Sequence, residues 1–174
     1  MRRIAIIQGE HAVVAEPGTV IATVLGSCIA VCLHDPVARV GGMNHFLLGE
    51  PARGHRIARE DRQRYGVHAM ELLINALMKA GAAPDRLRAH LYGGATMVAG
   101  LGGIGSGNAA FARRFMATEG IAVGHLDVGG THARMVEFRP FEGRSRAVAV
   151  ADAPVAMPAA AHSDRAGAGE LELF

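Results

Sequence analysis

The stretch TVLGSCIAVCLHDPVARVGGMNHFLL, residues 23–48, decides the fold because two apolar segments lie on either side of a turn sequence. Residues 28–33 and 40–48 have the composition of β-strands, and Asp35-Pro36 between them is typical of a turn. The stretch therefore predicts a β-hairpin.

This hairpin predicts that a thiol and an imidazole lie close together. If His34 pairs with Arg39 around a four-residue loop, Cys28 lies directly opposite His45. Opposed residues on one face of an antiparallel pair have Cβ atoms about 4.5–5.5 Å apart. Contact between the two side chains then needs only small adjustments.

Alternation along the first strand of the hairpin divides its side chains between two faces. One face is apolar and is expected to face the core: Ile29, Val31 and Leu33. The other carries small or polar side chains and is expected to line a cleft: Cys28, Ala30, Cys32 and His34.

Two interpretations of Cys28 follow from these residues alone. As a nucleophile, its thiolate is favoured by a neighbouring imidazolium, and the Gly26-Ser27 bend can turn backbone N–H groups toward an oxyanion. As a structural residue, a lone cysteine is a buried hydrophobe, which is how we interpret Cys32. The two thiols lie roughly 13 Å apart along a strand, too far to share a zinc ion, so we expect no metal.

The rest of the chain alternates between strands, loops and helices. We interpret residues 4–48 as a β-meander with strands at 20–25, 29–33 and 40–48, followed by an arginine-containing polar loop at 49–66. Further expected elements are a helix from Val67 to a stop at Gly81, strands at 87–92, 121–128 and 133–138, and a helix at 108–118 with Asn108 as N-cap. This pattern predicts an α+β fold, with a layered β-sheet or β-sandwich core flanked by helices.

Composition restricts the class of protein. The chain has 174 residues, 50% of them apolar and 20% charged, which is typical of one globular domain. We place that domain at residues 1–146, and interpret the Ala-, Pro- and Gly-rich residues 147–174 as a disordered tail. A net charge of +2 and the absence of tryptophan give no support for nucleic-acid binding. With no signal peptide or membrane span in the sequence, we expect a cytoplasmic protein that does not insert into membranes.

Several ordered motifs resemble the CheD family of chemoreceptor glutamine deamidases over about residues 4–140. The matching residues are Gly9-Glu10, Leu25-Gly26-Ser27-Cys28, Ala30-Val31-Cys32, Gly42-Met43-Asn44-His45, Gly93-Gly94-Ala95-Thr96-Met97, Ile104-Gly105, Asn108, Gly129-Gly130 and Arg134. The resemblance implies a cytoplasmic chemotaxis enzyme that needs no cofactor. It also implies two partners, the helical region of methyl-accepting chemoreceptors and, in many relatives, a CheC-type phosphatase.

The resemblance also implies roles for individual residues. Cys28 is the expected nucleophile, His45 the general base and acid, and an upstream threonine the third member. Some relatives have that threonine six residues before the cysteine, where this chain has Ala22, whereas Thr23 lies five before and would point to the opposite face of a strand. Expected oxyanion or cleft residues are Gly26, Ser27 and Asn44, and expected substrate-cleft residues are Gly93, Gly94, Asn108 and Arg134.

Two alternatives remain open from the sequence. Residues 100–105 fit the dinucleotide pattern G-x-G-x-x-G, but Ala95 to Ala99 separate them from the preceding strand, so we expect this loop to line the cleft instead. The second alternative is a non-catalytic adaptor that binds chemoreceptors or a CheC-type phosphatase. The intact pair of Cys28 and His45 favours the enzyme.

Overall fold

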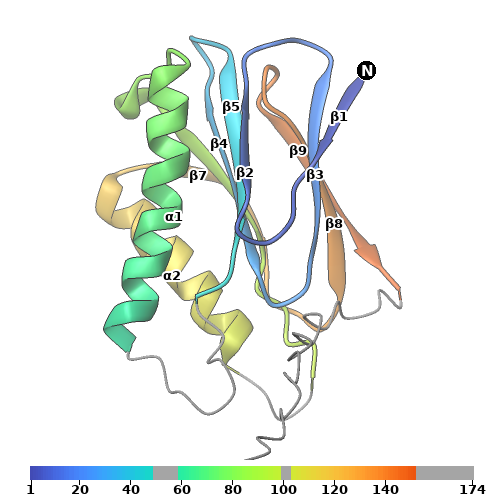
Figure 1. The fold of residues 1–174 in the computed structure, drawn as a ribbon. Helices are drawn as coiled ribbons and strands as arrows, with labels where there is room; N and C mark the ends of the chain where they lie inside the picture. The colour runs from blue at the N-terminus through green and yellow to red at the C-terminus, as the bar shows by residue number, and fades with distance from the viewer. Residues whose placement is uncertain (49–58, 99–102, 152–174) are drawn as a thin grey trace, which may run out of the picture.

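A computed structural model of the chain describes residues 1–48, 59–98 and 103–151 as three layers (Figure 1). One sheet has the order β1 (Arg2–Ala5), β3 (Thr19–Leu25), β8 (Ala133–Arg139), β9 (Arg144–Val150). The other has the order β2 (His11–Val14), β5 (Val40–Phe46), β4 (Ile29–Asp35), β6 (Arg88–Gly93), β7 (Ala122–Val128). The helices α1 (Arg59–Lys79) and α2 (Ile104–Glu119) cover the outer face of the five-stranded sheet, and a short 3-10 helix, η1 (Pro84–Arg86), precedes β6.

This arrangement confirms the predicted α+β sandwich in a single domain, but the predicted meander is wrong. Strand β1 pairs in parallel with β3, and β3 and β4 belong to different sheets although they follow each other in the chain. Strand β9 continues to Val150, four residues past the expected domain end at 146. The predicted disordered tail lies mostly at 152–174, outside the described residues.

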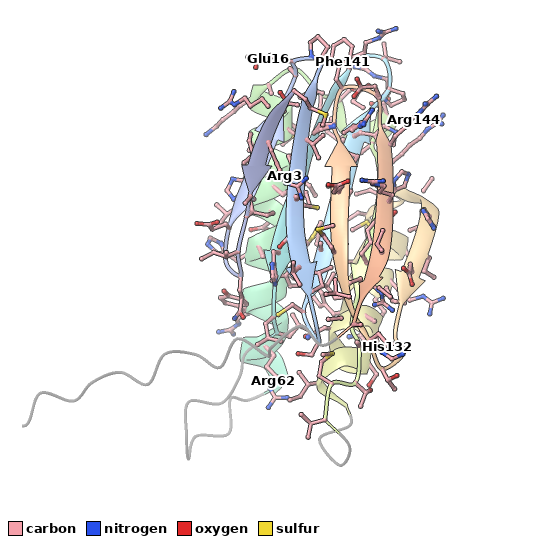
Figure 2. All side chains as sticks on the ribbon, turned by 90° about the vertical axis from the view of Figure 1, so that its right-hand side faces the viewer. Arg3, Glu16, Arg62, His132, Phe141 and Arg144 are labelled. Atoms are coloured by element: carbon pink, nitrogen blue, oxygen red, sulfur yellow. The ribbon has the colours of Figure 1, made fainter. Side chains whose placement is uncertain are left out.

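The outer face of the four-stranded sheet carries charged side chains instead of a helix (Figure 2). Glu137 on β8 accepts hydrogen bonds from Arg3 on β1 and from Arg146 on β9, both at 2.5 Å. These two guanidinium groups lower the pKa of Glu137. Cross-strand pairs of this kind stabilise a sheet face that stays in water.

Both faces of β4 are buried, which contradicts the expected cleft wall. Ile29, Val31 and Leu33 pack with the helices, as predicted, whereas Ala30 and Cys32 are fully buried between the two sheets. Burial raises the pKa of the Cys32 thiol, in agreement with a structural role for that residue. This face of β4 needs small side chains because a second sheet packs on it. No sequence pattern within the hairpin indicates that packing.

The hairpin forms, but its register differs from the prediction by two residues. Asp35 pairs with Val40, so Ala30 lies opposite His45, and Cys28 precedes the first residue of β4. A shift of two keeps every side chain on its predicted face. Had the pairing continued, Cys28 would lie diagonally across from His45 instead of directly opposite.

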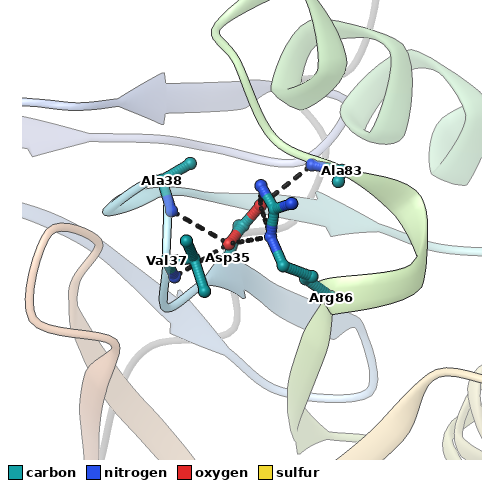
Figure 3. A network of polar contacts seen from close by, with 5 residues as sticks. All are labelled: Asp35, Val37, Ala38, Ala83 and Arg86. Atoms are coloured by element: carbon teal, nitrogen blue, oxygen red, sulfur yellow. Dashed lines mark hydrogen bonds and ion pairs between the residues drawn. The ribbon is translucent and has the colours of Figure 1, made fainter.

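The Asp35 side chain explains this register (Figure 3). Its Oδ1 accepts hydrogen bonds from the backbone N–H groups of Val37 (2.9 Å) and Ala38 (3.0 Å), which closes the turn one residue later than predicted. Oδ2 accepts from Ala83 N at 2.9 Å and contacts Arg86 at 2.8 Å. Burial alone would raise the pKa of Asp35, but these hydrogen bonds hold it well below its usual range.

Two helix starts differ from the prediction. Helix α1 begins at Arg59, within the expected loop 49–66, of which residues 49–58 lie outside the described residues. Helix α2 begins at Ile104 after Gly103, whose φ of 122° favours glycine, so Asn108 lies inside the helix and is not its N-cap. The glycines that looked like a loop therefore belong in part to the first turn of α2. No helix in the described ranges is long and apolar enough to cross a membrane.

Candidate active site

The turn from β3 to β4 carries Cys28 from one sheet to the other, at the end of the molecule where α2 begins (Figure 1). The three consecutive carbonyl groups of residues 26–28 all accept hydrogen bonds from residues 94–95 or from helix α2. Their donors are Ala95 N to Gly26 O at 3.0 Å, Asn108 Nδ2 to Ser27 O at 2.8 Å, and Gly94 N to Cys28 O at 2.8 Å. In a trans peptide the N–H points opposite to the C=O, so the N–H groups of Ser27 and Cys28 point away from this support.

Glycine is required at residue 93, because the backbone of Cys28 approaches it closely. The φ of Gly93 is 111°, and a Cβ at this position would lie 2.1 Å from the carbonyl oxygen of Cys28. Gly94 also has a positive φ, 67°, and its N–H holds Cys28 as described. The predicted cleft residues Gly93 and Gly94 thus lie directly behind the thiol-bearing turn.

The side chain of Arg134 on β8 links the backbone of Gly93 to that of Gly129. Its guanidinium donates to Gly93 O at 2.6 Å and to Gly129 O at 2.5 Å, and lies 3.4 Å from Asp127 Oδ1. Gly129 N in turn donates to Gly93 O at 2.8 Å. The structure therefore places the Arg134 side chain in the support of the turn, where it contacts two backbone carbonyl groups.

Asn108 connects the same turn to helix α2 and to the end of β5. It is buried, donating from Nδ2 to Ser27 O and accepting at Oδ1 from Leu48 N at 3.0 Å. Gly26 lies against Met97, with 3.1 Å between a Cβ at residue 26 and Met97 Cγ. Asn108 and Gly26 therefore make contacts that hold the turn in place, and the sequence motifs do not predict these contacts.

His45 and Thr23 come from different sheets and form a hydrogen bond between the layers. Thr23 Oγ1 lies 2.8 Å from His45 Nδ1, and also 2.8 Å from the carbonyl oxygen of Ile6. That carbonyl can only accept, so the single hydroxyl proton of Thr23 is donated to it. Nδ1 of His45 must then carry the proton that Thr23 Oγ1 accepts, and the lone pair of the neutral ring lies on Nε2.

The surroundings keep the His45 ring neutral. The side chain is buried, and Nε2 has no hydrogen-bond partner among the described residues. Burial lowers the pKa of His45 to about 4, against a smaller opposite effect of the Glu10 carboxylate. A neutral imidazole with an unpaired Nε2 is the form that accepts a proton.

Cys28 is half-buried and packs against the apolar cluster between the two sheets. Its Sγ lies 3.7 Å from Oε1 of Gln8, a residue in the turn between β1 and β2. Sequence reasoning did not identify Gln8, and its only signal is that it directly precedes the Gly9-Glu10 motif. Ile6 was also missed, because it acts through its carbonyl group.

Asn44 is the predicted oxyanion or cleft residue whose side chain the structure places elsewhere. Its Oδ1 accepts from Val31 N at 3.1 Å, and its Nδ2 lies 3.4 Å from Met70 Sδ on α1. Neighbouring strand residues point to opposite faces, so the amide of Asn44 faces α1 while His45 faces the other sheet. Asn44 therefore fixes β5 against the helix, and its amide does not point toward the thiol.

A pocket of about 220 Å³ lies beside His45, between α1 and the turn before β2. It is lined by Gly9, Glu10, His11, Asn44, His45, Tyr65, His68, Ala69 and Leu72. Across residues 1–48, 59–98 and 103–151, no three His, Cys, Asp or Glu side chains are grouped so that they could hold a metal ion.

A thiol on a tightly held turn, together with an imidazole oriented by a hydroxyl, is the arrangement used by cysteine-dependent acyl-transfer enzymes. Comparison with known proteins gives the family. The family described as CheD chemotactic sensory transduction matches residues 47–148. The chain belongs to the CheD family.

Its relatives carry consistent names. A Caulobacter sp. (strain K31) protein named "Probable chemoreceptor glutamine deamidase CheD" is 51% identical over 176 residues, covering 99% of this chain and 93% of the relative. A Zymomonas mobilis protein of the same name is 55% identical over 145 residues, covering 83% of this chain and 79% of the relative. Among solved structures, a Neisseria meningitidis protein of the DUF152 family is 19% identical, with a TM-score of 0.43 over 70% of this chain and 52% of that one.

Proposed function

We propose that this protein deamidates glutamine side chains of chemoreceptors to glutamate, with Cys28 as nucleophile, His45 as general base and acid, and Thr23 orienting the imidazole. The hydrogen bond between Thr23 and His45 is the observation that carries the proposal, because it leaves Nε2 as the proton acceptor. The names of the CheD relatives supply the substrate class.

The reaction proceeds by acyl transfer in two stages. Sγ of Cys28 attacks the amide carbon of the glutamine, and Nε2 of His45 takes the thiol proton. The C–N bond breaks, His45 returns the proton to the departing ammonia, and a thioester remains on Cys28. His45 then takes a proton from a water molecule, which attacks the thioester carbonyl. The C–S bond breaks, glutamate is released, and His45 returns its proton to the sulfur of Cys28.

Stabilisation of the oxyanion comes from the backbone near Ser27 and Cys28. The carbonyls of residues 26–28 are all directed toward the segment 94–95 and α2, so the following N–H groups face the other way. Donors that are already fixed lose little freedom when negative charge develops on the substrate oxygen. Gly93, Gly94, Asn108 and Arg134 act here as positioning residues, because each holds this backbone in place.

The burial of His45 makes a neutral imidazole the resting form of this side chain. Its pKa of about 4 opposes the imidazolium that the sequence led us to expect beside a thiolate. Proton transfer to His45 then accompanies the attack instead of preceding it. The step that releases ammonia uses the same proton.

The proposed substrate surface is the helical, Glu- and Gln-rich cytoplasmic region of the receptors, which places the enzyme in the cytoplasm. Arginines at the start of α1, among them Arg62 at the lower end in Figure 2, supply positive charge that complements such a surface. Arg53 and Arg56 lie outside the described residues. A CheC-type phosphatase is proposed as a second partner on the basis of the family resemblance alone.

The test follows ammonia release and intact mass of a receptor cytoplasmic fragment. The native protein and a Cys32→Ala variant are expected to convert glutamine to glutamate, and Cys28→Ala is expected to bind the fragment without converting it. Cys32 is the matched control because it is the second thiol, four residues along, and is fully buried. A native protein that binds receptor but releases no ammonia would support the adaptor alternative.

A further inference from the structure

The turn that carries Gln8 is fixed by both members of the buried pair. Ile6 O accepts from Thr23 Oγ1, Gly9 N donates to His45 O at 2.8 Å, and His45 N donates to Glu10 O at 3.0 Å. Gln8 lies between these anchors. The same residues that orient the imidazole therefore also determine where the Gln8 side chain is held.

The turn is also fixed internally. Glu10 N donates to Ile7 O at 3.0 Å, Ile7 N donates to Glu10 Oε2 at 2.9 Å, and Gly9 has a φ of 89°, which favours glycine. A turn closed in this way presents the side chain at position 8 in one direction. That direction brings Gln8 Oε1 to 3.7 Å from Cys28 Sγ.

The group placed on the thiol is a primary carboxamide, the same functional group that the proposed reaction consumes. We propose that Gln8 is an internal stand-in for the substrate: its carboxamide fills the glutamine subsite in the free protein and must leave before a receptor glutamine binds. This inference rests on the proposed deamidase function. It also places that subsite beside Cys28 Sγ, at the position of the Gln8 carboxamide.

Two features let Gln8 fill the subsite without being consumed. The thiol meets its oxygen as a hydrogen-bond donor, whereas attack requires the sulfur to approach the amide carbon. The turn is held at Ile6, Gly9 and Glu10, which restricts the movement that would bring the carbon forward. The Gln8 side chain is exposed and its contact to sulfur is a weak hydrogen bond, so a receptor glutamine displaces it at small cost.

The first test measures alkylation of Cys28 by iodoacetamide, itself a primary carboxamide, followed by peptide mass. Gln8→Ala is expected to react about two- to tenfold faster than the native protein. Ile7→Ala is the matched control, since Ile7 lies in the same turn and is 67% exposed. Equal rates in the native protein and Gln8→Ala would overturn the proposal.

The second test separates a stand-in from a residue that positions the nucleophile. With a receptor fragment, Gln8→Ala is expected to lower KM by a similar factor with kcat unchanged, whereas a drop in kcat would overturn the stand-in role. Native Gln8 is expected to keep its mass during turnover, and a Cys28-dependent conversion to glutamate would also overturn it. The two proposals can fail separately. If the native protein deamidates no receptor but Gln8→Ala still speeds alkylation, the proposed function is wrong, whereas the contact between Gln8 and Cys28 is confirmed.

Discussion

Thr23 Oγ1 lies 2.8 Å from His45 Nδ1, and this hydrogen bond joins the four-stranded sheet to the five-stranded sheet. Thr23 points into the sandwich because it lies on the same face of β3 as Ile21 and Leu25, whereas Val24 is 51% exposed. The residue five positions before Cys28 therefore reaches the imidazole, while Ala22 points to the outer face of the sheet. The catalytic assignment depends on what this bond does to the histidine.

Removing the Thr23 hydroxyl should reduce turnover by changing the histidine tautomer. Thr23→Val keeps the volume but removes the acceptor for His45 Nδ1–H, and we expect kcat to fall about 10- to 100-fold. Thr23→Ser keeps the hydroxyl and should retain most of the activity. Ammonia release from a receptor fragment measures both variants, and full activity in Thr23→Val would show that His45 needs no such orientation.

Arg134 should contribute to stability as well as to the shape of the site. Arg134→Met leaves the carbonyls of Gly93 and Gly129 without these donors, and we expect a loss of about 1–3 kcal/mol in the free energy of unfolding. Urea titration measures the loss. Arg139→Met, an exposed position on the same strand, is the control and should change the urea midpoint little.

Gly93→Ala should abolish activity by displacing the nucleophile. The Cβ would lie 2.1 Å from Cys28 O, and the φ of 111° is unfavourable for alanine, so the turn must move. Gly107→Ala in α2 is the control: no described residue has an atom within 4 Å of its Cβ, and the change should stabilise the helix by up to about 1 kcal/mol. Circular dichroism measures the folding of both variants, and ammonia release measures their activity. An active Gly93→Ala protein would contradict the described turn.

Mild acid should destabilise the fold through its buried histidines. Burial lowers the pKa of His45 to about 4 from an unfolded value of 6.5, and burial with neighbouring His34 and His125 lowers that of His90 to about 4. Between pH 4 and pH 6.5 these histidines bind more protons in the unfolded chain than in the folded protein. The stabilisation is therefore complete above pH 6.5 and is lost as the pH falls toward 4, with His45 alone corresponding to about 3 kcal/mol.

Urea midpoints at pH 7 and pH 5 measure this dependence. His45→Gln should flatten it, because a neutral side chain replaces the titrating one. A pH dependence identical in the native protein and His45→Gln would contradict the buried, neutral ring.

The sequence predicted the hairpin and most strands because their apolar alternation is local. It placed Cys28 opposite His45, two residues out of register, since nothing in the strands shows that the Asp35 side chain extends the pairing. It misplaced Asn108 as a cap because a polar residue after glycines resembles a helix start, whereas its partners, Ser27 and Leu48, are remote in the chain. Contacts between sheets, such as Thr23 with His45, have no periodicity to reveal them.

The most direct test of the account is to trap the covalent intermediate. Rapid acid quenching of the native protein with a receptor fragment, followed by intact mass, should reveal an adduct equal to protein plus fragment minus ammonia, localised to Cys28 and cleaved by hydroxylamine. Cys28→Ala should form no adduct and produce no glutamate. Deamidation of the fragment by Cys28→Ala at the native rate would contradict the proposed mechanism.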